Sequence, residues 1–262
     1  METLNLSFLE SLARRAGEIV RLGYNARPGF GSRLVVNHKG VIDLVTDVDH
    51  RSEDFLLGEI RSHFPSHRIL SEESGRLEGV DSCAWYVDPL DGTVNFAHGI
   101  PIFAVSVAFA EDGAMRFGVV YDPTRDECFT AERGKGAWLN GEPVRASEIT
   151  DLDHSLLATG FPYDIRTNPA NNLDNYARFA VRSQAVRRLG SAALDACYVA
   201  AGRFDGYWEL GVHAWDVAAA GLIAEEAGAR VTDAAGGPEY LLPGSILVAN
   251  PAIHAQMLAV LG

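Results

Sequence analysis

Apolar residues recur at helical spacing close to the start of the chain. They lie three or four positions apart, the period that brings side chains to one face of a helix: Phe8, Leu12, Ala16, Ile19, Val20 and Gly23. Ser7 stands just before this pattern and Glu10 follows three positions later, a spacing typical of a capping box. The pattern predicts an amphipathic helix that begins at Ser7.

A second helical pattern follows a glycine-rich, basic stretch at residues 27–40. Asp49 lies near its N-terminal cap, and Pro65 marks its end because proline cannot continue a helix. Its apolar positions are Phe55, Leu56, Ile60 and Phe64. We expect these two helices to cover one face of a sheet.

Short apolar runs replace the helical pattern between residues 102 and 145. They cover residues 102–110, 117–121, 128–130 and 137–139, and turn sequences rich in Asp, Asn, Gly and Pro separate them. This arrangement predicts an antiparallel meander. After residue 150, short strands (156–159, 185–188, 206–209 and 246–249) alternate with helical stretches (171–181, 192–201, 215–227 and 251–261), as in an α/β fold.

The change of pattern near residue 145 divides the chain into two parts. We expect an N-terminal α+β subdomain over residues 1–145 and a C-terminal α/β subdomain over residues 146–262. No internal repeat, low-complexity tract or long linker separates them. The two parts should therefore pack as one compact structural domain with a seam between them.

Composition and charge narrow the class of protein. Of 262 residues, 47% are hydrophobic and 22% are charged, which excludes a disordered or collagen-like chain. The formal net charge is −13, so the long-range field repels nucleic acid and anionic lipid. We expect no nucleic-acid partner and no membrane partner, and an anionic substrate needs a local counter-charge.

The cysteines and the N-terminal segment bear on the compartment. Cys83, Cys128 and Cys197 are widely spaced and form no C-x-x-C pair, which argues against a disulfide framework or a structural zinc site. Residues 1–11 carry no long apolar region, and no run reaches the ~18 apolar residues of a membrane span. We expect a cytoplasmic protein.

Candidate chemistry concentrates at residues 85–96. An apolar strand leads into two carboxylates, Asp88 and Asp91, in a turn stiffened by Pro89. If Thr93 opens a helix, the backbone amides of Gly92 and Thr93 form a cradle for an anion. Asp-Pro and Asp-Gly are also common turn dipeptides, but the whole string favours carboxylates for a hard cation beside amides for a phosphate.

Two further acidic features have a similar placement. Glu72 and Glu73 end a short apolar run, and Asp216 lies in the first turn of an apolar helix. Each has a simpler explanation, as a solvated surface pair or as a charge that complements the helix dipole. Together, however, acids at the ends of three elements would repel one another unless cations lay between them.

These motifs resemble those of the inositol monophosphatase family of magnesium-dependent, lithium-sensitive phosphatases. The resemblance extends over essentially the whole chain, in blocks at residues 44–49 with Glu53, 71–74, 88–96 with Pro101, 188–193, 207–211 and 215–220. Ser71 replaces a more usual glycine, a change expected not to affect metal binding. The resemblance implies a layered αβαβα sugar-phosphatase fold, an active site at the seam, and a homodimer.

The same resemblance implies a ligand set for Mg²⁺. Glu72, Asp88 and the Leu90 carbonyl would hold a first ion, and Asp88, Asp91 and Asp216 a second, with a third, weaker ion near Glu72. Oxygen ligands of this kind suit Mg²⁺. The catalytic residues implied are Asp49, Thr93 and Glu72, of which Thr93 and Asp49 would activate a water molecule. Asp47 is the competing candidate for the role of Asp49.

For the substrate, the resemblance implies that the amides of Gly92 and Thr93 bind phosphate. The alcohol would face Gly190, Ser191, Ala192 and Glu209, and Glu72, Leu90, Asp91 and Asp216 complete the substrate site. Alternatively, the Glu209 carboxylate forms an ion pair with a surface arginine and has no role in substrate binding. His213 is expected to be structural, and Lys39 to be solvated.

The expected reaction is hydrolysis of a phosphate monoester by metal-activated water, with myo-inositol 1-phosphate as the first substrate and with inhibition by Li⁺. Fructose 1,6-bisphosphate, histidinol phosphate and an adenosine 3′-phosphate are alternatives within the family. A non-catalytic regulatory binding protein is the alternative from a different class. An aspartyl-phosphate phosphatase is disfavoured because Arg51 stands where such a motif needs Thr or Val, and no nucleotide-binding glycine motif occurs.

Overall fold

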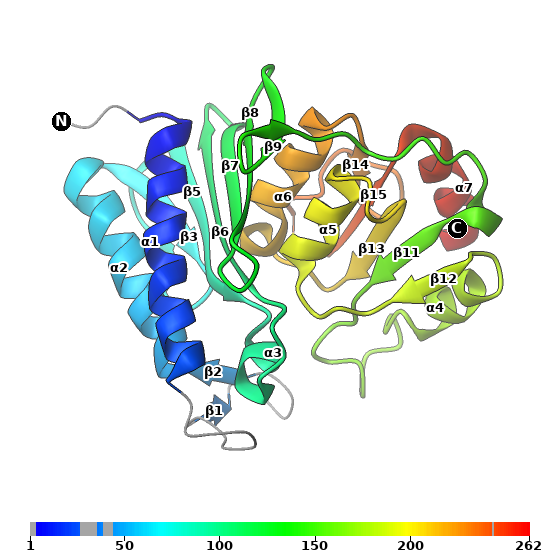
Figure 1. Ribbon diagram of the computed structural model, residues 1–262, viewed down its shortest axis with the longest axis horizontal. Helices are drawn as coiled ribbons and strands as arrows, with labels where there is room; N and C mark the ends of the chain where they lie inside the picture. The colour runs from blue at the N-terminus through cyan, green and yellow to red at the C-terminus, as the bar shows by residue number, and fades with distance from the viewer. Residues whose placement is uncertain (1–3, 27–35, 39–43, 243) are drawn as a thin grey trace.

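Five layers make up the computed structural model, which describes residues 4–26, 36–38, 44–242 and 244–262. Helices α1 (Leu6–Asn25) and α2 (Asp47–His63) cover one face of an eight-stranded sheet. Helices α5 (Ala192–Ala200) and α6 (Ala214–Glu226) lie between that sheet and a five-stranded sheet. Helices α4 (Leu173–Ala180) and α7 (Pro251–Leu261) cover the outer face of the second sheet (Figure 1). The αβαβα prediction is confirmed.

The larger sheet contains the predicted meander. Its strands are β3 (His67–Ser71), β4 (Gly75–Leu77), β5 (Val80–Asp91), β6 (Ala104–Glu111), β7 (Ala114–Asp122), β8 (Glu127–Glu132), β9 (Gly136–Leu139) and β10 (Glu142–Pro143), in the order β10-β9-β8-β7-β6-β5-β3-β4. Only β3 and β5 are parallel neighbours within it. A separate ribbon pairs β1 (Val36–His38) with β2 (Leu44–Thr46).

The smaller sheet follows the eight-stranded one in the chain. Its strands are β11 (Leu156–Thr159), β12 (Ala185–Arg187), β13 (Gly206–Leu210), β14 (Arg230–Thr232) and β15 (Ser245–Ala249), in the order β12-β11-β13-β15-β14. A 3₁₀ turn, η1 (Leu152–His154), precedes it. The strands β12, β11 and β13 run parallel, whereas β15 is antiparallel to both of its neighbours.

The helix starts differ in detail from the sequence expectation. Asn5 caps α1 by accepting a hydrogen bond from the Phe8 amide (2.9 Å), so the predicted cap at Ser7 is wrong by two residues. Thr46 caps α2, and Asp49 is the third residue of its capping box. The end of α2 before Pro65 and the start of α3 (Thr93–His98) at Thr93 are as predicted.

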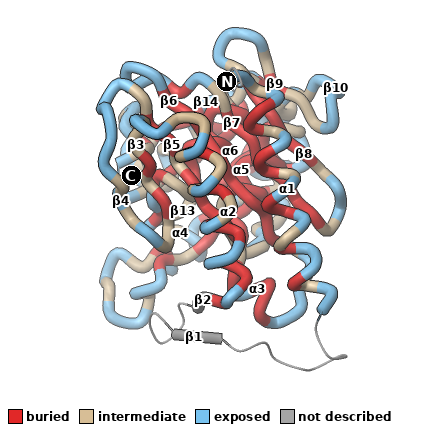
Figure 2. Tube along the Cα trace, turned by 90° about the vertical axis from the view of Figure 1, so that its left-hand side faces the viewer, coloured by how far each residue is buried: buried red, intermediate tan, exposed pale blue. Residues whose placement is uncertain are grey.

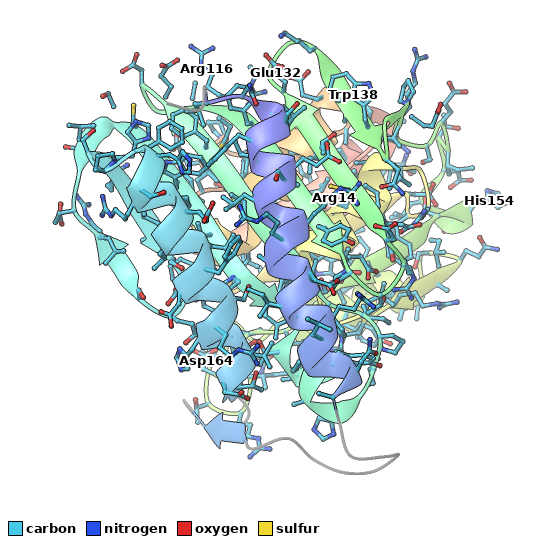
Figure 3. All side chains as sticks on the ribbon, turned by 60° about the vertical axis from the view of Figure 1, so that its left-hand side comes forward. Arg14, Arg116, Glu132, Trp138, His154 and Asp164 are labelled. Carbon is cyan, nitrogen blue, oxygen red and sulfur yellow. The ribbon has the colours of Figure 1, made fainter. Side chains whose placement is uncertain are left out.

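Three apolar clusters hold the layers together, and central strands such as β6 are largely buried, whereas β4, β10 and β12 at the sheet edges are not (Figure 2). One cluster joins α1 and α2 to the large sheet, one surrounds α5 and α6, and one joins the small sheet to α4 and α7. Charged side chains cover the outside, as where Arg14 reaches from α1 to Asp126 (3.0 Å; Figure 3). None of the helices in the described ranges is long and apolar enough to cross a bilayer.

Candidate active site

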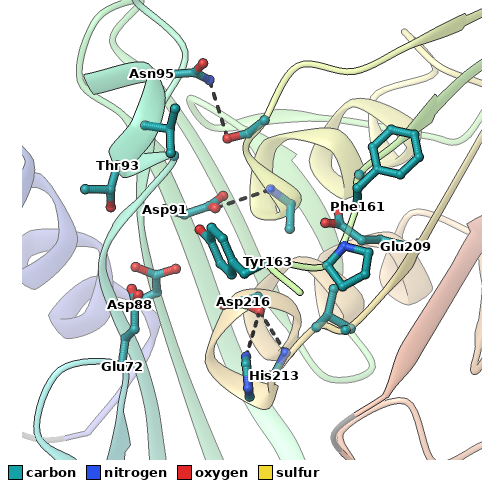
Figure 4. A pocket seen from close by; sticks show the side chains of 18 of the residues that line it. Glu72, Asp88, Asp91, Thr93, Asn95, Phe161, Tyr163, Glu209, His213 and Asp216 are labelled. Carbon is teal, nitrogen blue, oxygen red and sulfur yellow. Dashed lines mark hydrogen bonds and ion pairs between the residues drawn. The ribbon is translucent and has the colours of Figure 1, made fainter. Parts of the chain in front are cut away.

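A cavity of about 540 Å³ lies between the two sheets and collects most of the predicted site residues (Figure 4). Its lining includes Glu72, Asp88, Leu90, Asp91, Gly92, Thr93, Gly190, Ala192, Glu209 and Asp216. Asp49 and Ser191 do not line it, but each hydrogen-bonds a residue that does. Lys39 lies outside the described residues.

Strand order explains how distant acids meet. The neighbouring strands β3 and β5 are parallel, so Glu72, just after β3, and Asp88, near the end of β5, lie at the same edge of the sheet. The pairing of β5 with β6 shifts register between Asp88 and Asp91, a bulge that redirects both side chains. The first turn of α6 adds Asp216 from the other side of the cavity.

Asp88 lies at the centre of the acidic group. It is 2% exposed, and its Oδ1 accepts a hydrogen bond from the Leu90 amide (3.0 Å). Burial raises the pKa of Asp88 well above its usual value, and the charges of Glu72, Asp91 and Asp216 raise it further. A carboxylate in such a place needs a positive charge to remain ionised.

Asp91 joins the large sheet to the N-terminus of α5. It accepts hydrogen bonds from the Ser191 hydroxyl (2.5 Å) and from the amides of Ala193 (2.8 Å) and Ala192 (3.3 Å; Figure 4). Burial raises its pKa to about 7, although these donors oppose the shift. The α5 residues predicted to face substrate therefore contact a predicted metal ligand as well.

Thr93 and Asp49 form a buried hydrogen-bonded pair. The Thr93 hydroxyl lies 2.9 Å from Asp49 Oδ1 and 3.0 Å from the Leu90 carbonyl oxygen. Asp49 also accepts from the amide (3.0 Å) and the hydroxyl of Thr46, whereas Asp47 is exposed on the helix. Burial raises the pKa of Asp49 to about 6. The geometry therefore favours Asp49 over Asp47.

Glu209 extends from β13 into the other end of the cavity. The Tyr207 hydroxyl donates to its Oε2 (2.7 Å), and burial raises its pKa to about 8, with further upward shifts from Asp216 and Asp91. Arg188 acts in the opposite direction on that pKa. No ion pair joins Glu209 to an arginine among the described residues, so the carboxylate is available to face a ligand.

The donor set fits a hard cation. The side chains and the Leu90 carbonyl offer oxygen atoms, the ligands that Mg²⁺ prefers. Burial, and after it the neighbouring carboxylates, raises the pKa of Asp88 and Asp91. Within the described ranges, no three His, Cys, Asp or Glu side chains converge on one point. Two of the acids are turned toward nearby amides, Asp91 toward Ala193 and Asp216 toward His213 (2.7 Å; Figure 4).

Sequence reasoning missed several residues of this site. Asn95 donates to the carbonyls of Leu189 (2.7 Å) and Ile102 (2.9 Å), which joins α3 to the loop before α5. Phe161 and Tyr163 form a wall of the cavity, and Arg188 lies over the Phe161 ring (5.6 Å from its centroid). Asn95 and Arg188 lie within sequence blocks that carry the family resemblance, but they had been given no role. Phe161 and Tyr163 carried no local signal, because only tertiary folding brings them to the cavity.

Known proteins resemble the chain over nearly its full length. The model of the inositol monophosphatase family matches residues 3–261. Nus factor SuhB of Escherichia coli (strain K12) is 44% identical over 248 residues, covering 94% of this chain and 91% of that protein.

Solved structures agree with this similarity. An inositol monophosphatase from Anabaena is 40% identical with a TM-score of 0.87, covering 98% of this chain and 94% of that one. The extragenic suppressor protein suhB of Bartonella henselae is 38% identical with a TM-score of 0.89, covering 97% and 96%. These relationships support phosphatase activity at the level of the family. The chain belongs to the inositol monophosphatase family.

Proposed function

We propose that this protein is a Mg²⁺-dependent phosphate monoester hydrolase whose substrate is a small polyol phosphate, with myo-inositol 1-phosphate as the first candidate. The observation that carries the proposal is the joining of three features in one cavity. These are the carboxylate group around Asp88, the Thr93–Asp49 pair, and Glu209 at the opposite end.

The family resemblance implies two main metal positions and a third, weaker one, and we propose them for this chain. Glu72, Asp88 and the Leu90 carbonyl would hold one Mg²⁺, Asp88, Asp91 and Asp216 a second, and a third, weaker ion would lie near Glu72. When bound, Mg²⁺ lowers the pKa of a water molecule and neutralises phosphate charge. In this proposal, Asp88 contributes to both of the main positions.

The Thr93–Asp49 pair is suited to accept a proton. The Thr93 oxygen can accept a hydrogen bond from a water molecule while its own hydrogen points to Asp49 Oδ1 (2.9 Å). With a pKa of about 6, Asp49 is mostly ionised at neutral pH yet is still basic enough to take up a proton. We infer that this pair orients the nucleophile and receives its proton.

The other end of the cavity is suited to a polyol. Glu209 can accept hydrogen bonds from substrate hydroxyls beside Gly190 and Ala192, which line the cavity, and Ser191 would act there through its hydrogen bond to Asp91. The amides of Gly92 and Thr93 would contact the phosphate. A generic phosphatase needs no such carboxylate at the alcohol side. Glu209 is therefore the main argument for a polyol substrate.

Phosphate release from a four-substrate panel tests the proposal. The panel contains myo-inositol 1-phosphate, fructose 1,6-bisphosphate, histidinol phosphate and adenosine 3′-phosphate, each with Mg²⁺ or with excess EDTA. We expect Mg²⁺-dependent turnover, highest for the inositol ester, and inhibition by millimolar Li⁺. Equal rates in EDTA would refute the metal mechanism, and a preference for another ester would reassign the substrate.

A second candidate is a regulatory binding role. The relative from Escherichia coli is named a Nus factor, and a regulatory protein could keep the same pocket. A folded protein that releases phosphate from none of the four esters would favour this role. We expect a homodimer under either function, and light scattering after gel filtration measures the molar mass that tests this expectation.

A further inference from the structure

The buried face of α2 carries three polar side chains, of which the sequence motifs gave a role only to Asp49 and none to Ser52 and Glu53. Ser52 and Glu53 lie three and four positions after Asp49, and the exposed fractions of the three residues are 0% for Asp49, 0% for Ser52 and 3% for Glu53. Burying two carboxylates and a hydroxyl costs free energy unless hydrogen bonds satisfy them. Each of the three is satisfied by a different segment at the rim of the cavity.

Glu53 binds the turn that presents Glu72. Its Oε1 accepts from the amides of Glu73 (3.2 Å) and Ser74 (3.0 Å) and from the Ser71 hydroxyl, and its Oε2 accepts from the Ser74 hydroxyl (2.6 Å). These donors lie on both sides of Glu72 in the chain. The turn closes the antiparallel pair of β3 and β4, where Ser71 faces Gly75.

The other two residues of this face hold the neighbouring segments. The Ser52 hydroxyl donates to the Pro89 carbonyl (2.9 Å), between Asp88 and Asp91, and Asp49 accepts from Thr93. One face of one helix therefore sets the relative positions of Glu72, the end of β5 and the start of α3. Of these three segments, Glu53 holds the turn at residues 71–74, and it does so through four hydrogen bonds.

We propose that Glu53 is a positioning residue that holds the turn at residues 71–74, so that the Glu72 carboxylate is fixed in place to bind a divalent cation. This inference rests on the proposed metal-dependent function. Hydrogen bonds to an ionised carboxylate are stronger than neutral ones, and a ligand held in its bound geometry loses less freedom on binding. The Ser71 hydroxyl supplies one of the four donors, so in this proposal it also contributes to metal affinity, contrary to the expectation from the sequence that Ser71 leaves metal binding unaffected.

The test measures cation binding directly, without substrate. Isothermal titration calorimetry with Mn²⁺ as the probe compares the wild type with Glu53→Gln. This substitution replaces the carboxylate by a neutral amide, whose NH₂ group faces the donors of the turn and cannot accept their hydrogen bonds. Residues that orient a metal ligand typically contribute about 10- to 100-fold to affinity. We expect Glu53→Gln to bind Mn²⁺ at least about tenfold more weakly, and Ser71→Gly about threefold more weakly because it removes one hydrogen bond.

Asp205→Asn is the matched control. Asp205 is also a buried carboxylate (8% exposed), and it accepts from the Ser147 hydroxyl (2.6 Å) and the Leu156 amide (2.7 Å), away from the cavity. Its substitution should lower the melting temperature and leave the Mn²⁺ affinity unchanged. A Glu53→Gln protein that behaves in the same way would overturn the proposal, since Glu53 would then be only structural.

The remaining outcomes are also decisive. If Glu53→Gln does not fold, Ser71→Gly alone decides, and an unchanged Mn²⁺ affinity in that variant overturns the proposal. Failure of the wild type itself to bind Mn²⁺ would instead refute the proposed metal-dependent function. The two failures are therefore distinguishable.

Discussion

Glu209 owes its position to the absence of a side chain at residue 160. A β-carbon built on Gly160 would lie 2.1 Å from the Glu209 carboxylate, which is far inside van der Waals contact. To avoid this β-carbon, Glu209 would have to turn away from Tyr207, from whose hydroxyl it accepts a hydrogen bond (2.7 Å). Gly160 therefore leaves room for Glu209 in the proposed substrate site, although it has no functional group.

A pair of substitutions tests the role of this carboxylate. We expect Glu209→Gln and Gly160→Ala each to lower kcat/KM for myo-inositol 1-phosphate by about tenfold or more, because each change removes or displaces the acceptor of the substrate hydroxyls, and a polar group left unpaired costs ~1–3 kcal/mol. Turnover of p-nitrophenyl phosphate, which has no polyol, should change little. Equal losses on both substrates would show that Glu209 supports the metal site or the fold instead.

At the scale of elements, α7 packs on β14 through a buried histidine. His254 is 0% exposed, and its Nε2 lies 2.9 Å from the Thr232 hydroxyl. That hydroxyl donates to the Asp233 carbonyl (2.8 Å), so it accepts from Nε2–H. In the part of the chain that the structure describes, Nδ1 has no partner. Burial, together with the charge of Arg230, lowers the pKa of His254 to about 4.

This histidine makes the stability of the protein depend on pH. An unfolded histidine has a pKa near ~6.5, so between pH ~6.5 and ~4 the unfolded chain binds a proton that the folded protein does not. The free energy of unfolding contributed by His254 is therefore complete above pH ~6.5 and falls as the pH drops, by on the order of 1–2 kcal/mol at pH ~4.5. Urea unfolding at pH 7 and at pH 4.5 measures this loss in the free energy of unfolding. His254→Gln should show a smaller loss than the wild type, and an equal loss in both proteins would contradict this origin.

Local patterns predicted the long elements well and the short ones poorly. The apolar periods of α1, α2 and the meander extend over many residues, whereas β14 has three residues and gave no signal. The cap of α1 was misplaced because Asn5 and Ser7 are both good caps and only the structure shows which one meets the Phe8 amide. The antiparallel direction of β15 depends on strand order, which local sequence does not encode.

For the site, the sequence could show only those residues that lie close together in the chain. Asp88, Asp91, Gly92 and Thr93 lie within six residues, so their shared chemistry was visible as one string. Glu53 meets its partners about twenty residues further along the chain, and Gly160 meets Glu209 after about fifty. Each of these residues is ordinary in its local context, and only the fold gives it a role.

At the scale of the whole molecule, the cavity places like charges from both parts of the chain against each other. Glu72, Asp88 and Asp91 come from the larger sheet, and Glu209 and Asp216 come from elements after residue 145. Among the described residues lining the cavity, Arg188 is the only lysine or arginine. A chain with a net charge of −13 supplies little compensation at longer range. Cations at the seam should therefore join the two parts as well as serve the reaction.

The melting temperature should accordingly rise when Mg²⁺ is added. Ligand at about a hundred times its Kd stabilises the folded state by ~2.7 kcal/mol, and each kcal/mol raises the melting temperature of a chain of this size by about 2–4 °C. We expect a rise of about 5–10 °C over KCl of equal ionic strength, measured by calorimetry. Asp91→Asn should lose most of this rise while remaining folded, because it removes a ligand and also lessens the repulsion. Asp205→Asn, whose carboxylate lies elsewhere, should keep the full rise. If Asp91→Asn kept the full rise in melting temperature with Mg²⁺, the ion would bind outside this cavity. Other groups would then balance the repulsion between the carboxylates at the seam.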